Sequence, residues 1–383
     1  MNTLIELYDE RPIENVLASE VFRPERTVFL CPPAVAQDKR QRDVLQSYFR
    51  HKGLNSELVF LESSMYNADK VALQLRSLAE KYPDAVVDIT GGTDAALFAC
   101  GKVSAECGLP AFTYSRKRRC FFGIHNAPFE NELPCTVEHR VEDCFLMAGG
   151  KMRQGRVNNA ILSKYAASFR SFFDLYLQNR DEWASAVTYF QRVSQNDSGL
   201  KITAPYSVGG NVEANERLLY GLQKIGFLSG VSVANGKVSF AFRDEQVRTW
   251  LRDVGSVLEL FVYQTCLESG LFSDVCTSAV VDWEGKNARD DVTNEIDVMA
   301  MKGILPVFIS CKTCAVATEA LNELAILRDR FGGKGAVAAI VTTKPCRSIM
   351  RNRAAELNID VIDFSDLKNG KLQERLVGML RED

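Results

Sequence analysis

Short apolar runs alternate with longer amphipathic segments over the first 125 residues, and no other feature of the chain restricts its fold as strongly. The apolar runs, which predict strands, are Thr3–Tyr8, Thr27–Cys31, Glu57–Leu61, Ala85–Ile89 and Ala111–Tyr114. The segments between them, which predict helices, are Ile13–Val21, Lys39–Lys52, Lys70–Lys81 and Ala95–Cys107. Such alternation is typical of an α/β domain, in which helices cover both faces of a parallel sheet. A further strand, Cys120–Ile124, is expected to pair as a hairpin after the basic turn Arg116–Arg119.

The middle of the chain, residues 149–244, differs in character from what precedes it. The helices predicted there are Val157–Leu177, Glu182–Gln195 and Ala214–Ile225. They are followed by Val231–Ala234 and Lys237–Phe242, two strands joined by Asn-Gly, which is a strong hairpin signal. Helices followed by such a hairpin are typical of a winged-helix element. Because no basic recognition helix accompanies them, we interpret this region as a structural linker.

The last part of the chain predicts a helix, three strands, a second helix and a fourth strand. In order, these are Glu245–Ser269, Asp274–Asp282, Glu295–Met301, Leu305–Cys311, Thr318–Phe331 and Ala336–Thr342. This is the order of elements in a restriction-endonuclease core. We therefore predict three domains, at residues 1–148, 149–244 and 245–383.

Composition excludes several classes of protein. Hydrophobic residues make up 46% and charged residues 25% of the chain, as in ordinary globular proteins. No apolar run has the length of a membrane span and no signal peptide is evident, so we expect a cytoplasmic protein without a membrane partner. The net charge of −3 does not by itself indicate a nucleic-acid partner. The 11 cysteines include a CxxC at Cys311–Cys314, but no second ligand pair supports a zinc site.

The segments Asn294–Val298 and Phe308–Lys312 read as two strands of a hairpin that brings an acid and a lysine together. Hydrolysis of a phosphodiester needs a divalent cation, held by carboxylates, to activate water and to neutralise the phosphate. A neighbouring lysine can orient the water or stabilise the transition state. The spacing matches a PD-(D/E)xK nuclease core, with Asp297 as the first acid and Lys312 as the lysine. Ser310 occupies the usual position of the second acid.

Other residues are candidates to complete this site around Mg²⁺ or Mn²⁺. Glu259 lies in an apolar stretch of the predicted helix, a position where nucleases of this type often carry a glutamate. An exposed helix face is the alternative interpretation of Glu259. Glu295 shares a strand face with Asp297 and is either a metal ligand or a solvated acid. The backbone carbonyl of Cys311 is a further candidate ligand.

A second candidate site is the turn Asp88–Thr93, at the end of a buried strand and just before a helix. Glycines there allow a ligand to approach the backbone, and the helix N-terminus offers free amides to an anion. Ligands bind open α/β sheets at the carboxyl ends of the strands. A purely structural turn is an equally good interpretation of the glycines taken alone.

The turn resembles the signature of CARF domains, the Rossmann-like sensors of CRISPR-linked proteins, in which a strand ends in an Asn-x-Thr-Gly-Gly-Thr-Lys-like sequence. Asp88 and Asp94 stand here where asparagine and lysine are common. The loop Tyr8–Val16 also resembles the first loop of a CARF subgroup that carries a C-terminal PD-(D/E)xK nuclease. The residues that match the family's motifs are Asp9, Glu10, Arg11, Pro12, Thr90, Gly91, Gly92 and Thr93.

The resemblance implies an ancillary nuclease of type III CRISPR antiviral defence, switched on by a cyclic oligoadenylate. In that family the messenger, most often cyclic tetra-adenylate, lies across the two-fold axis of a CARF homodimer. The eight residues above would line its pocket, and Arg116 or Lys117 could supply charge for its phosphates.

Two alternatives remain open from the sequence. The chain could be a ligand-responsive regulator that binds nucleic acid and whose nuclease domain is inactive, as Ser310 would favour. The N-terminal domain could also degrade the messenger itself. RNA, single-stranded DNA and duplex DNA are all possible substrates, because this chemistry needs no 2′-hydroxyl.

Overall fold

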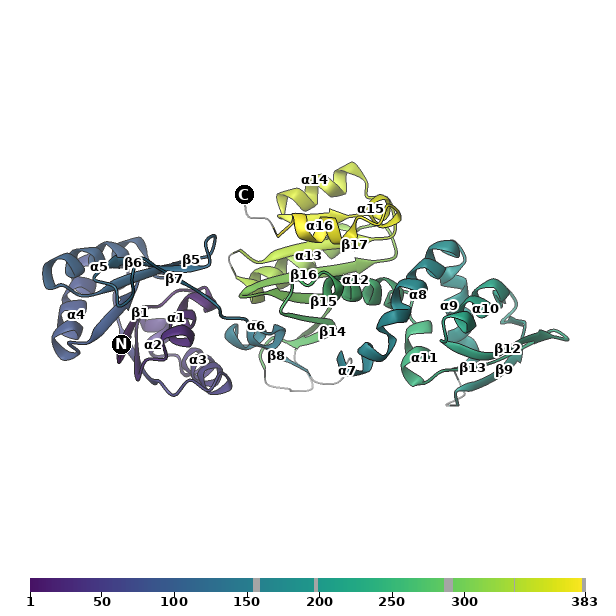
Figure 1. Cartoon of the computed structure of the whole chain (residues 1–383), viewed down its shortest axis with the longest axis horizontal. Helices are drawn as coiled ribbons and strands as arrows, with labels where there is room; N and C mark the ends of the chain where they lie inside the picture. The colour runs from purple at the N-terminus through teal and green to yellow at the C-terminus, as the bar shows by residue number, and fades with distance from the viewer. Residues whose placement is uncertain (154–158, 196–198, 286–291, 334, 381–383) are drawn as a thin grey trace.

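The computed structural model describes residues 1–153, 159–195, 199–285, 292–333 and 335–380. Three lobes follow one another in a row: an N-terminal α/β lobe, a central lobe built on a mixed sheet, and a helical lobe with a small sheet (Figure 1). Within these ranges, no helix is long and apolar enough to cross a membrane.

The N-terminal sheet has the strand order β3-β2-β1-β4-β5-β6-β7, and its first five strands are parallel. Its strands are β1 (Thr3–Leu7), β2 (Arg26–Cys31), β3 (Glu57–Glu62), β4 (Ala85–Asp88), β5 (Ala111–Ser115), β6 (Cys120–His125) and β7 (Glu132–Pro134). Its helices are α1 (Leu17–Phe22), α2 (Pro33–Ala36), α3 (Lys39–His51), α4 (Ala68–Lys81) and α5 (Asp94–Cys107). α4 and α5 cover one face, while α1 and α3 cover the other. The predicted parallel sheet and the β5–β6 hairpin are confirmed.

The prediction of one helix over Ile13–Val21 is wrong. A 3₁₀ turn, η1 (Pro12–Asn15), and α1 replace it, and Val16 between them has φ −129°. The reason is the side chain of Asn15, which bonds back to the main chain of Asp9. Its amide donates to the Asp9 carbonyl at 2.7 Å, and its oxygen accepts from the Asp9 amide at 2.9 Å. The segment therefore shapes the loop after β1.

The helical lobe lies at the end of the molecule opposite the N-terminal lobe (Figure 1). Its helices are α7 (Asn159–Leu162), α8 (Ala166–Gln178), α9 (Trp183–Val193) and α10 (Glu216–Lys224), and residues 157 and 158 of the predicted helix lie outside the described residues. Its main sheet consists of β9 (Lys201–Pro205), β12 (Leu228–Ala234) and β13 (Lys237–Phe242), and a small ribbon pairs β10 (Ser207–Val208) with β11 (Val212–Glu213). The predicted hairpin is confirmed, with Asn235 at φ 52° and Gly236 at φ 68°.

The central sheet has the order β18-β17-β16-β15-β14-β8. Its strands are β8 (Lys151–Met152), β14 (Asp274–Asp282), β15 (Thr293–Lys302), β16 (Leu305–Lys312), β17 (Val337–Thr342) and β18 (Ile359–Ile362). Its helices are α6 (Val141–Met147), α12 (Ser256–Glu268), α13 (Thr318–Leu327), α14 (Ser348–Glu356), α15 (Phe364–Lys368) and α16 (Leu372–Gly378). β15 and β16 pair as an antiparallel hairpin, and β16 pairs in parallel with β17.

The chain crosses into the central lobe before it forms the helical lobe. α6 packs into the core of the central sheet through Val141, Cys144 and Phe145, and β8 pairs with β14 and forms one edge of that sheet. The chain then forms the helical lobe and returns through α11 (Glu245–Leu251) and α12. The domain limits at residues 148 and 244 remain predictions.

Two predicted helices of the central lobe differ from those in the structure. The helix predicted over Glu245–Ser269 is divided into α11 and α12, because the Asp253 carboxylate accepts from the Ser256 amide at 2.9 Å and hydroxyl at 2.7 Å and so starts a new helix. The helix predicted over Thr318–Phe331 ends as α13 at Leu327 and continues as one π-helical turn, η3 (Arg328–Gly332).

Candidate functional site

The hairpin of β15 and β16 brings Asp297 beside three donors of the neighbouring strand. The register pairs Val298 with Ile309, which places Asp297 next to the end of β16. Its Oδ2 accepts from the Ser310 hydroxyl at 3.1 Å, from the Cys311 amide at 2.6 Å and from the Lys312 ammonium at 3.3 Å. Its other oxygen, Oδ1, has no hydrogen-bond partner among the described residues. One oxygen is therefore fixed by the protein while the other can take a ligand.

Lys312 is held as a cation at this position. Burial lowers the pKa of its ammonium group, but the carboxylate of Asp297 beside it raises the pKa by more, and the net shift is upward. The lysine therefore stays charged at neutral pH, as a group that stabilises negative charge on a phosphate must.

Glu259 extends from α12 into a cavity of about 510 Å³ whose wall also includes Asp253, Glu295 and Asp297. Burial raises the pKa of the Glu259 carboxyl to about 8, and the charges of Asp297, Asp253 and Glu295 add to the rise. The structure thus brings together Glu259, Glu295 and Asp297, which the sequence separates by up to 38 positions. Glu259 faces a cavity shared with other acids, which favours the functional interpretation over an exposed helix face.

Two neighbouring residues of β14, absent from the predicted set, support Asp297 and Glu259. The Thr277 hydroxyl donates to the Asp297 carbonyl oxygen at 2.7 Å, and the Ser278 hydroxyl donates to Glu259 Oε2 at 3.4 Å. Ser278 has φ 51°, a left-handed conformation that residues with a side chain rarely adopt and that is often found at functional sites. The sequence carries no signal for this conformation.

The donors in this cavity fit a hard divalent cation. The described residues contain no group of three or more histidine, cysteine, aspartate or glutamate side chains placed to hold a metal ion. Mg²⁺, however, commonly takes one or two carboxylates and keeps several waters. Asp297 and Glu259 supply two carboxylates, and a cation would offset the burial and the repulsion that raise the Glu259 pKa. The donor set is therefore compatible with Mg²⁺ or Mn²⁺.

A second cavity, of about 790 Å³, lies at the carboxyl end of the N-terminal sheet. Six predicted ligand-binding residues line it: Asp9, Glu10, Arg11, Pro12, Gly92 and Thr93. The two oxygens of Asp9 accept from the Arg11 guanidinium at 2.6 Å each, and Oδ2 also accepts from the Gly92 amide at 3.1 Å. Burial raises the pKa of Asp9, but the bonds from Arg11 lower it by more. Asp9 thus ties the loop after β1 to the glycine turn after β4.

Thr90 and Gly91 belong to the same turn but do not line the cavity; their contacts hold the turn in its conformation. The Thr90 amide donates to Asp88 Oδ1 at 2.7 Å, and the Thr90 hydroxyl accepts from the Tyr114 amide at 2.8 Å. Burial raises the pKa of the Asp88 carboxyl to about 7. A β-carbon on Gly91 would lie 2.8 Å from the Asp9 β-carbon, so only glycine allows this close approach.

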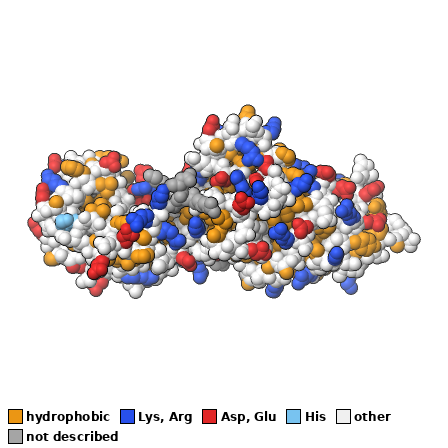
Figure 2. All heavy atoms as spheres, turned by 45° about the horizontal axis from the view of Figure 1, so that its top comes forward, with side chains coloured by type: hydrophobic (Ala, Val, Ile, Leu, Met, Phe, Trp, Pro, Cys, Tyr) orange, Lys and Arg blue, Asp and Glu red, His pale blue; other side chains and the backbone are white. Residues whose placement is uncertain are grey.

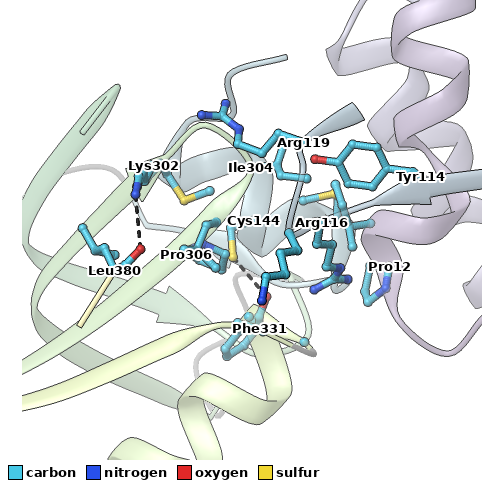
Figure 3. A pocket seen from close by; sticks show the side chains of 18 residues that line it. Pro12, Tyr114, Arg116, Arg119, Cys144, Lys302, Ile304, Pro306, Phe331 and Leu380 are labelled. Atoms are coloured by element: carbon cyan, nitrogen blue, oxygen red, sulfur yellow. Dashed lines mark hydrogen bonds between the residues drawn. The ribbon is translucent and has the colours of Figure 1, made fainter. Parts of the chain in front are cut away.

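The structure places Arg116 and Lys117 on a different cavity from the other predicted ligand-binding residues. This cavity, of about 530 Å³, lies between the β5–β6 turn and the β15–β16 turn, and Figure 3 shows the side chains around it. Arg116 forms an ion pair at 2.6 Å with the buried Glu14 of the turn after β1. Pro12 lines both cavities. The basic turn therefore faces the central lobe.

The surface carries no single basic face on the side seen in Figure 2. Lysine and arginine side chains are spread over all three lobes and alternate with acidic ones.

Comparisons with known proteins agree with this architecture. Residues 244–381 match the family model of the Card1-like endonuclease domain. No curated protein sequence matches the chain. Among solved structures, protein VC1899 from Vibrio cholerae superimposes with a TM-score of 0.77 at 18% identity, over 98% of this chain and 97% of that one.

Two further solved structures are of proteins with a described ligand or activity. Can2 from Sulfobacillus thermosulfidooxidans, solved in complex with cyclic tetra-adenylate, matches with a TM-score of 0.72 at 18% identity, over all of both chains. A type III CRISPR defence DNA nuclease activated by cyclic oligoadenylate matches with a TM-score of 0.52 at 15% identity, over 96% of this chain and 51% of that one. Such identities establish the fold.

The whole chain shares its fold with Can2, and the C-terminal match assigns residues 244–381 to the Card1-like endonuclease domain. The N-terminal lobe has a Rossmann-like α/β fold. The predicted fold class is confirmed.

Proposed function

We propose that this protein is a metal-dependent nuclease of type III CRISPR defence that a cyclic oligoadenylate activates. The observation that carries the proposal is the arrangement of Asp297, Lys312 and Glu259 around one acidic cavity in a Card1-like endonuclease domain. It is supported by the fold shared with Can2, which was solved with cyclic tetra-adenylate.

The chemistry is of the PD-(D/E)xK type. Asp297 and Glu259 would hold Mg²⁺ or Mn²⁺, with Glu295 and the Cys311 carbonyl as additional ligands. The bound cation lowers the pKa of water and neutralises the phosphate. Lys312, whose ammonium lies 3.3 Å from Asp297 Oδ2, orients the attacking water and stabilises the negative charge that develops on the phosphate. Solvent protonates the leaving oxygen.

Ser310 has a positioning role in this scheme. Its hydroxyl donates to Asp297 Oδ2, the oxygen that Cys311 and Lys312 also contact, and so helps to direct Oδ1 toward the cavity. A serine binds a hard cation more weakly than a carboxylate does, so Glu259 takes over the role of the second acid.

The cavity at the carboxyl end of the N-terminal sheet would bind the messenger. Asp9–Pro12, Gly92 and Thr93 line it, Thr90 and Gly91 shape the turn behind them, and the amides at the start of α5 would be available to an incoming phosphate. We assign cyclic tetra-adenylate as the activator, on the basis of the Can2 complex.

The active form is a homodimer, since a two-fold-symmetric messenger suits a pocket shared by two copies. The sensor domain exposes three large apolar side chains, one of which lines this cavity. Tyr66 on the cavity wall is 85% exposed, Leu73 on α4 is 67% exposed and Phe98 on α5 is 70% exposed. Their burial against a second copy would stabilise the dimer.

The sensor domain contacts the hairpin of β15 and β16 directly. The guanidinium of Arg119 lies against Gly303, in the turn that joins β15 and β16, and the His139 amide donates to the Gly303 carbonyl at 2.9 Å. The same hairpin carries Asp297 and Lys312. The messenger activates only if it binds the competent arrangement of the two lobes more tightly than the resting one.

Cleavage assays on variants test the site. Labelled RNA, single-stranded DNA and duplex DNA are incubated with protein, cyclic tetra-adenylate and Mg²⁺ or Mn²⁺. We expect Asp297→Ala and Lys312→Ala to lower cleavage by at least about 100-fold, and EDTA to abolish it. Full activity of either variant would refute the assignment. Because the chain shares its fold with a type III CRISPR defence DNA nuclease, DNA is the first substrate to try.

Ser310 favours a second candidate, a ligand-responsive regulator that binds nucleic acid without cutting it. This alternative predicts no cleavage under any of these conditions and no gain of activity in Ser310→Glu.

A further inference from the structure

The cavity of the sensor domain is closed on one side by residues that belong to the central lobe. Met147, Ala148 and Gly149, at the end of α6, line it together with Arg330 of η3. Arg330 lies 290 positions after Arg40, which lines the same cavity from α3. A ligand in this cavity would therefore touch the sensor and the nuclease domain at once.

Arg330 and Arg40 are the cations of this cavity that no acid neutralises within the described residues. The third arginine, Arg11, is already bound to Asp9 at 2.6 Å and to Glu14 at 3.4 Å. Partial burial and the neighbouring charge of Arg40 lower the pKa of the Arg330 guanidinium. An anion bound between two guanidinium groups accepts charge-assisted hydrogen bonds from both and offsets their mutual repulsion.

Arg330 is anchored firmly in the nuclease domain. The adjoining Phe331 is buried and packs edge-on against Phe145 at 5.3 Å and Trp283 at 5.7 Å between ring centroids. The Arg328 guanidinium donates to the Leu357 and Asn358 carbonyls at 2.7 and 3.0 Å.

The π-helical turn also touches the strand that carries Lys312. A β-carbon on Gly332 would lie 2.8 Å from the ring of Phe308 in β16, which means that the two segments are in close contact. π-Helical turns are rare and occur frequently at functional sites. The π-helical turn that carries Arg330 is therefore packed directly against the strand that holds the lysine.

We infer that Arg330 and Arg40 form a phosphate-binding pair that joins the two domains through the bound messenger. One phosphate of the cyclic oligoadenylate lies between the two guanidinium groups. The inference rests on the proposed function and adds to it a ligand contact made by the nuclease domain itself. Because Arg330 moves with the nuclease domain, the same contact favours one arrangement of the two lobes and acts as part of the switch.

Titration calorimetry of the full-length protein with cyclic tetra-adenylate tests the pair. One charge-assisted contact to phosphate corresponds to about tenfold or more in affinity. We expect Arg330→Ala and Arg40→Ala each to raise the Kd by at least about tenfold, and Arg330→Lys to recover part of the loss. Arg353→Ala, an exposed arginine on α14 that pairs with Glu356, is the matched control and should bind as wild type does.

A second measurement separates binding from switching. At saturating messenger, Arg40→Ala should regain wild-type cleavage, whereas Arg330→Ala should remain less active because its nuclease domain no longer contacts the ligand. Wild-type affinity and wild-type activation of Arg330→Ala would overturn the inference alone. A wild-type protein that binds no cyclic tetra-adenylate would overturn the inference and the proposed activator together. Equal melting temperatures without ligand establish that the variants are folded.

Discussion

Replacement of Glu259 by glutamine gives a sharp test of the acidic cavity, because the variant should gain stability while it loses activity. The Glu259 carboxyl has its pKa raised from 4.5 to about 8 by burial and by neighbouring acids. A group with a raised folded-state pKa contributes stability that is complete below its unfolded pKa. That contribution is lost as the pH rises through the pKa of the group in the folded state. The wild type should therefore weaken between pH 4.5 and pH 8 in the absence of metal.

The magnitude follows from the shift. At about 1.4 kcal/mol per pKa unit, the full rise corresponds to about 5 kcal/mol, an upper bound. Because the carboxyl opens onto a solvent-filled cavity, we expect about 2–3 kcal/mol at pH 9 in EDTA. Glutamine has a similar shape and no charge, so Glu259→Gln should exceed the wild type by this amount at pH 9 and match it near pH 4.5.

Denaturant unfolding in EDTA, followed by tryptophan fluorescence, measures the difference. Trp250 lines the same cavity as Glu259 and reports its unfolding. Glu319→Gln, an exposed acid on α13, is the matched control and should change nothing. With Mg²⁺ at about 100 times its Kd, the wild type should gain about 2.7 kcal/mol and the Glu259→Gln variant much less. A variant less stable than the wild type at pH 9 in EDTA would refute the electrostatic account of this cavity.

Three further predictions concern single residues. Gly91→Ala would place a β-carbon 2.8 Å from that of Asp9, so we expect at least about tenfold weaker binding of cyclic tetra-adenylate by calorimetry, with the nuclease fold intact; unchanged affinity would contradict the close approach. Lys312→Met keeps the stem but removes the charge, so cleavage should fall at least about 100-fold while messenger affinity stays the same; a fall in both would point to a structural role. Ser310→Glu restores the usual second acid and should tighten Mg²⁺ binding in a metal titration, whereas weaker binding would show that the site cannot accept another carboxylate.

The regular elements could be predicted from the sequence because local periodicity determines them. Strands β1–β6 of the N-terminal sheet, strands β14–β17 of the central sheet and the Asn235-Gly236 hairpin agree with the prediction, whereas the short edge strands β7 and β8 are absent from it. The pairing of Asp297 with Lys312 could be predicted for the same reason, because a short hairpin determines which residues lie side by side.

Features that depend on tertiary contacts could not be predicted. The division of the helix before Glu259 depends on the Asp253 cap, and the split at Val16 depends on Asn15 bonding to the loop before it. The prediction for the basic turn rests on its charge and on its place after the fifth strand, and the sequence does not reveal that Arg116 pairs with a buried acid and lines a cavity against the central lobe. Nothing in the local sequence places Arg330 in the sensor cavity.

The central claim of this account is that a cyclic oligoadenylate switches on the acidic cavity of the nuclease domain. The most direct measurement is the rate of cleavage of labelled DNA and RNA in Mg²⁺ or Mn²⁺, with and without cyclic tetra-adenylate, for the wild type and for Asp297→Ala. The account predicts rapid cleavage only for the wild type and only with the messenger. Cleavage at the same rate without the messenger, or by Asp297→Ala, would contradict it.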